Sequence, residues 1–186
     1  MKKSLLIILG VAVVILIFAS YYNQLVSKNE AVAAQWAQVE TQYQRRFDLI
    51  PNLVASVEGI MAQEQTVFET IAQARSQYAN SQSVEEKVAA ANEVESSLSR
   101  LLVIMENYPQ LGSSENVTRL MDELAGTENR VAVERRRFND LVEEYNVLVK
   151  RFPGSLLAAL FGFDQKLFFT SAEGASVAPN VDINPQ

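Results

Sequence analysis

Residues 117–148 read VTRLMDELAGTENRVAVERRRFNDLVEEYNVL, and the spacing of this stretch decides the fold. Its core-type residues recur in alternating steps of three and four, which is the heptad period of a helix that packs along its whole length. The members of this seam are Val117, Leu120, Leu124, Thr127, Val131, Glu134, Phe138, Leu141, Tyr145 and Leu148. The spacing predicts one long helix over residues 115–151, and such a helix needs partner helices.

Working outward, three shorter stretches repeat apolar residues at helical spacing. The first runs over residues 23–47. Because Asp48 suits a helix N-cap and Pro51 suits a first turn, we predict a break at Arg46–Leu49 and a second helix to about Tyr78. A continuous helix kinked at the proline is the alternative. A third helix starts with a capping box at Ser83 and Glu86 and ends near residue 108, before a proline.

Composition supports a helical bundle and excludes several classes of protein. The 186 residues include only 7 Gly and 5 Pro, too few for a fold with frequent turns. Neither Cys nor His is present, which removes thiolate and imidazole chemistry and the usual zinc and haem ligands. With 16 basic against 22 acidic residues, the net charge is -6, so nucleic acid is not expected as a partner. We therefore predict no enzyme activity, cofactor or metal.

The N-terminal residues predict a membrane anchor. The run Leu5–Ala19 is wholly apolar, and with the flanking Ser4, Ser20, Tyr21 and Tyr22 it approaches the roughly 20 residues that cross a bilayer. The tyrosines suit the lipid–water interface. A cleaved signal peptide is the alternative, but the bulky side chains before Ser20 make a poor cleavage site.

Two lysines precede the anchor, and they predict its orientation. By the positive-inside rule, Lys2 and Lys3 place the N-terminus in the cytoplasm and the rest of the chain outside it. A cytoplasmic body is the alternative.

Five of the nine phenylalanines fall close together near the C-terminus. They are Phe152, Phe161, Phe163, Phe168 and Phe169. This is more apolar surface than a protein usually leaves exposed. Either a short helix at Ser155–Leu160 folds back and covers it, or it docks on another subunit or on membrane. We predict self-association through these residues.

Four charged residues on or beside the apolar seams predict a buried polar network. They are Glu64, Glu128, Glu134 and Arg135. Arginines such as Arg75 or Arg135 would pair with the carboxylates and fix the helix register. A ligand or metal site between helices is the alternative, although bundle di-metal sites generally include histidine.

The predicted fold is all-α, with a single N-terminal transmembrane helix followed by an elongated antiparallel four-helix bundle. Four regions follow: an anchor at residues 1–22, the bundle at 23–151, a Phe-rich segment at 152–170 and an extended or disordered tail at 171–186.

Several motifs, in order, resemble the LemA family of bacterial membrane-anchored proteins. These are RRFDLIPNLV (45–54), ENYPQL (106–111), TENRVAVERRRFND (127–140), EYN (144–146) and RFPGSLLAALFGF (151–163). The resemblance covers about residues 22–169 and implies one transmembrane helix followed by a helical bundle. It implies no established activity. Family descriptions often place the short N-terminus outside the cell, and some relatives are associated with building intracellular membrane compartments.

Together these observations predict a non-enzymatic scaffold, anchored in the cell membrane, that self-associates and organises or shapes membrane. Membrane lipid and further copies of the chain are the expected partners. An adaptor or receptor-like partner of a membrane protease or transporter is the main alternative. A carboxylate enzyme or metal-binding protein using Glu64, Glu128 or Glu134 is the other.

Overall fold

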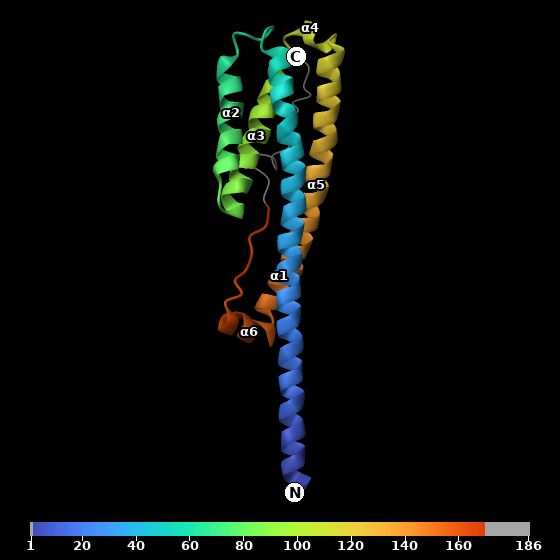
Figure 1. Cartoon of the computed structure of the whole chain (residues 1–186), viewed down its shortest axis with the longest axis vertical. Helices are drawn as coiled ribbons and strands as arrows, with labels where there is room; N and C mark the ends of the chain where they lie inside the picture. The colour runs from blue at the N-terminus through green and yellow to red at the C-terminus, as the bar shows by residue number, and fades with distance from the viewer. Residues whose placement is uncertain (1, 170–186) are drawn as a thin grey trace, which may run out of the picture. The chain divides into compact units, whose positions relative to one another are not determined.

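A computed structural model describes residues 2–169 of the chain, and this part is all-helical, which confirms the predicted class (Figure 1). The helices divide between two units, each described by itself. The first unit combines most of α1 (Lys2–Val57) with α5 (Glu115–Lys150) and α6 (Gly154–Phe161). The second holds α2 (Gln65–Asn80), α3 (Val84–Met105) and α4 (Pro109–Gly112). The four-helix bundle stays a prediction, and the tail at 171–186 lies outside the described residues.

Helix α1 runs without interruption for 56 residues, so the predicted break at Arg46–Leu49 is wrong. Pro51 lies inside the helix and is exposed. An interior proline costs about 3 kcal/mol because it removes one backbone hydrogen bond and crowds the preceding turn. Buried side chains continue at helical spacing across it, from Phe47 through Ile50 and Leu53 to Val57. Burying these four side chains offsets the cost of the proline, at about 1.5–3 kcal/mol each.

Helix α5 lies antiparallel to α1 within the first unit (Figure 1). Its N-terminus is capped by Ser114, whose hydroxyl accepts a hydrogen bond from the Val117 N–H at 3.5 Å. Its bounds agree with the predicted helix to within one residue. The seam is buried from Val117 to Phe138 except at half-buried Glu134, but further on Val142 and Asn146 are buried while Leu141 and Leu148 are only half-buried. A straight helix of 3.6 residues per turn drifts from the heptad repeat, which explains this shift.

The second unit is centred on the helix pair α2 and α3. Helix α2 begins at Gln65, whereas the sequence predicted that this helix starts at Asp48; the start is later because α1 occupies the sequence up to Val57. The predicted capping box at the start of α3 is confirmed: the Ser83 hydroxyl accepts from the Glu86 N–H at 3.1 Å. The Glu86 carboxylate accepts in turn from the backbone of Gln82 and Ser83, and these bonds lower its pKa.

Helix α6 confirms the short helix expected near residues 155–160. It starts at Gly154, where a side chain would collide with the carbonyl oxygen of Leu148 at the end of α5. It stops at Gly162, whose φ of 73° is a left-handed conformation that glycine adopts readily. The two glycines therefore allow the chain to turn sharply after α5 and to leave α6 again.

Candidate membrane-contacting site

The N-terminal part of α1 exposes its apolar side chains. Leu5, Leu9 and Leu16 are 60–69% exposed, and the most apolar stretch of α1 has no buried residue. This part of α1 extends beyond the end of α5 (Figure 1). Among residues 2–169, α1 alone is long and apolar enough to cross a membrane. The exposure fits membrane localisation, because lipid tails would cover side chains that water hydrates poorly.

An aromatic cluster marks the end of this apolar span. The ring of Tyr22 lies 4.9 Å from the ring of Phe161 and 6.1 Å from that of Phe163, measured between centroids. The cluster joins α1 to α6 and to the residue that follows the α6 C-cap. The tyrosine expected at the lipid–water boundary therefore contacts the Phe-rich segment.

The EYN motif at 144–146 holds the segment that follows α6. The hydroxyl of Tyr145 donates to the backbone carbonyl of Asp164 at 2.9 Å. The Asn146 side chain donates to the carbonyl of Lys166 at 2.8 Å and accepts from the Lys166 N–H at 2.9 Å. Burial raises the pKa of Tyr145, and the Asp164 charge adds to the effect. Sequence reasoning missed Asn146; the only available signal was a polar residue next to the seam inside a family motif.

The structure divides the five phenylalanines that the sequence assigned to self-association. Phe152, Phe161 and Phe168 are exposed by 78%, 55% and 48%, whereas Phe163 is half-buried and Phe169 is buried. Other exposed apolar side chains lie in the same segment: Leu156, Leu160 and Leu167. Self-association through the phenylalanines stays a prediction.

The predicted polar network is only partly buried. The Glu128 side chain is 65% exposed, because residue 128 is turned about 100° from the Thr127 position of the seam. Its partner Arg46 is the buried member, with a guanidinium nitrogen 3.6 Å from the Glu128 carboxylate. The sequence did not predict this, because it placed Arg46 in a turn.

Glu134 is better enclosed, with 17% of its side chain exposed. Its carboxylate accepts from Gln35 at 2.6 Å and pairs with Arg137 at 2.8 Å, while Arg135 is half-buried. The geometry therefore gives Glu134 a structural role in joining α5 to α1.

Glu64 belongs to the second unit and precedes α2. Its carboxylate accepts a hydrogen bond from the Tyr108 hydroxyl at 3.3 Å, which ties the start of α2 to the start of α4. Burial raises the pKa of Tyr108, and the Glu64 charge adds to it. Across residues 2–169, no three acidic side chains are placed to hold a metal ion together.

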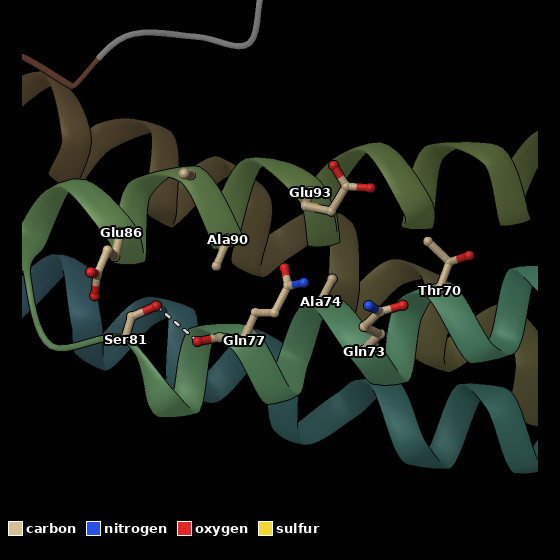
Figure 2. A pocket seen from close by; sticks show the side chains of 9 residues that line it. Thr70, Gln73, Ala74, Gln77, Ser81, Glu86, Ala90 and Glu93 are labelled. Carbon is tan, nitrogen blue, oxygen red and sulfur yellow. Dashed lines mark hydrogen bonds between the residues drawn. The ribbon is translucent and has the colours of Figure 1, made fainter.

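A cavity of about 560 Å³ lies between α2 and α3 (Figure 2). Small and polar residues line it, including Gln73, Gln77, Ala90 and Glu93. Two of its polar groups serve the local backbone: the Ser81 hydroxyl donates to the Gln77 carbonyl at 2.8 Å, and the Glu86 carboxylate belongs to the capping box. This cavity is therefore a weaker candidate for a functional site than the apolar surface near Tyr22.

Fold and surface define a membrane-associated helical protein with an apolar N-terminal helix. The chain belongs to the LemA family, whose pattern it matches over residues 35–183. It is 25% identical over 174 residues to the magnetosome protein MamQ of Magnetospirillum gryphiswaldense, covering 80% of this chain and 64% of that protein. It is 23% identical over 188 residues to magnetosome proteins MamQ 1 and MamQ 2 of Paramagnetospirillum magneticum, covering 87% of this chain and 69% of each relative. The chain thus spans about two thirds of the length of these relatives.

Proposed function

We propose that this protein is a non-enzymatic scaffold, anchored in the cell membrane by α1, that self-associates and organises membrane. The observation that carries the proposal is the continuity of α1. One helix holds both the exposed apolar span and buried residues from Leu25 to Val57. No flexible linker separates anchor from body, so the first unit keeps a fixed height and orientation above the bilayer.

The chemistry of the chain and its relatives support this proposal. Without Cys or His the chain lacks the side chains of most active sites. Its described carboxylates at Glu64, Glu128 and Glu134 engage tyrosine, glutamine or arginine partners of the chain itself. The relatives that it matches are named as magnetosome proteins, which agrees with a role in organising membrane. Stoichiometric metal in the purified protein, measured by mass spectrometry, would contradict this function.

The orientation that we propose places the body outside the cytoplasm, because Lys2 and Lys3 precede the apolar span. Protease added to intact spheroplasts should therefore digest the body. A cytoplasmic protein of the same cells, probed in the same samples, should stay intact and serves as the control. If the body is digested only after lysis, the orientation is the reverse.

The proposed function also includes self-association of the chain in the membrane. Anchoring by one rigid helix confines all copies to a plane in a shared orientation, which raises their effective concentration. Because the chain has no cysteine, the variant Asn129→Cys offers a single labelling site on the exposed surface of α5. Donor- and acceptor-labelled copies, mixed in one bilayer, should show energy transfer that persists when lipid is added in excess.

Unlabelled protein is the control for this measurement, since it should compete the energy transfer away. Transfer that falls to the level of random collisions as the bilayer is diluted would show that the protein is monomeric.

A further inference from the structure

We infer that the bilayer surface covers the exposed apolar side chains of the segment 152–161, so that α6 is a second membrane contact lying in the lipid headgroup region. This inference rests on the anchoring part of the proposed function and is independent of self-association. It assigns Phe152 and Phe161 to lipid, whereas the sequence had assigned them to contacts between copies. Phe168 is not included, because the bonds between Asn146 and Lys166 hold the chain before it farther from the membrane than the end of α5.

The first observation behind this inference is the register of α5 along α1. Lys28 forms an ion pair with Glu144, Trp36 packs edge-on against Phe138 at 5.5 Å, and Asn116 donates to the Ser56 hydroxyl at 3.2 Å. These three contacts keep one antiparallel register along α5 from Asn116 to Glu144.

The same register gives the level at which α5 ends. Lys150 lies six residues beyond Glu144, and Tyr22 lies six residues before Lys28. The end of α5 is therefore level with Tyr22, at the end of the apolar span.

The contacts of Tyr22 place α6 at the same level. Tyr22 touches Phe161 and Phe163, and it follows Ala19, the last residue of the apolar run, by three positions. At 1.5 Å per residue, the contact lies about 4.5 Å beyond the end of the span. Interfacial helices bury their apolar face roughly 5–10 Å into the boundary between headgroups and acyl chains. The headgroup layer on each side of a bilayer is about 5–7 Å thick, so the contact between Tyr22 and α6 lies within this layer, next to that boundary.

The surface of α6 also has the character of an interfacial helix. Leu157 and Ala158 face the protein and are buried, while Leu156 and Leu160 are 55% and 72% exposed. Phe152, 78% exposed, extends this surface before the helix. In water such a surface would be costly, and here it adjoins the lipid-exposed surface of α1.

The local charge favours an anionic bilayer. Residues 150–169 contain three basic residues, Lys150, Arg151 and Lys166, against one acidic residue, Asp164. The segment thus has a net charge of +2 in a chain whose total is -6. Basic residues beside an apolar helix face are typical of helices that bind anionic lipid surfaces.

Fluorophore labels on single cysteines test the depth of α6 in the full-length protein, reconstituted in vesicles of phosphatidylethanolamine and phosphatidylglycerol. Leu160→Cys reports on the exposed face of α6, and Phe152→Cys is a second site should the first variant misfold. Val133→Cys is the matched control, because Val133 is an exposed aliphatic residue of α5. It lies 17 residues before Lys150, about 25 Å further from the membrane. Val14→Cys reports on the anchor itself.

We expect brominated lipids to quench the labels at positions 160 and 152, and iodide in the water to quench them several-fold less than the label at position 133. Equal iodide quenching at 160, 152 and 133, with no lipid quenching at 160 or 152, would overturn the inference. A second result would also overturn it: the labels are protected from iodide but not quenched by lipid, and this protection is lost when lipid is added in excess. A second copy of the chain would then cover the surface. If the label at position 14 also escapes lipid quenching, the anchor proposal itself fails.

Discussion

Replacing Phe138 by alanine should destabilise the folded protein by roughly 3–5 kcal/mol, which is the usual cost of removing a buried phenylalanine. Phe138 is 3% exposed and packs against Trp36, itself 8% exposed, so the truncation opens a cavity between α5 and α1. The aromatic pair also loses its edge-to-face contact. Chemical denaturation of detergent-solubilised protein, followed by circular dichroism, measures the change.

Arg136→Ala is the matched control, because Arg136 is exposed on the same helix two residues away. Its effect should stay within about 0.5 kcal/mol, as is usual for surface substitutions. Similar losses in the two variants would show that the α5 seam does not face a packed core.

Introducing two arginines into the apolar span, Val11→Arg with Ile15→Arg, should abolish stable membrane insertion. Each arginine near the centre of a spanning helix costs about 2.5–3.5 kcal/mol, and each lost aliphatic residue removes about 0.3–0.6 kcal/mol. The pair therefore raises the insertion free energy by roughly 6–8 kcal/mol, which is at least about 10⁴-fold in the partition constant. Extraction of membranes with alkaline carbonate, which releases proteins that are not inserted, should release the double variant.

The apolar double variant, Val11→Leu with Ile15→Leu, is the control and should remain in the membrane pellet. Val11 and Ile15 are 54% and 61% exposed, so neither pair disturbs the folded body. Retention of the double arginine variant after carbonate extraction would mean that residues 5–19 do not form the anchor.

Local sequence signals determined most of the helices. The seam of α5, the capping box at Ser83 and Glu86, and the short helix between Gly154 and Gly162 all agree with the structure. Each depends on residues within a few positions of one another: a repeat, a cap, or a glycine where no side chain fits. Because these signals are local, the helices that depend on them could be predicted from the sequence alone.

Tertiary structure decided what depends on distant contacts. Pro51 can either end a helix or be tolerated within one. The outcome depends on how much apolar surface of the flanking Ile50 and Leu53 is buried, and a local sequence pattern does not contain this information. The same continuity moved Arg46 from an expected turn into the core, opposite Glu128.

The candidate site shows the same division between local and distant information. The sequence by itself identified the apolar N-terminal run, Tyr22 and the cluster of phenylalanines. It could not show that the two hydrogen bonds between Asn146 and Lys166 hold the segment after α6, or that Phe161 meets Tyr22. These contacts join residues that are 20 and 139 positions apart in the chain, and only the antiparallel register of α1 and α5 brings Phe161 to Tyr22.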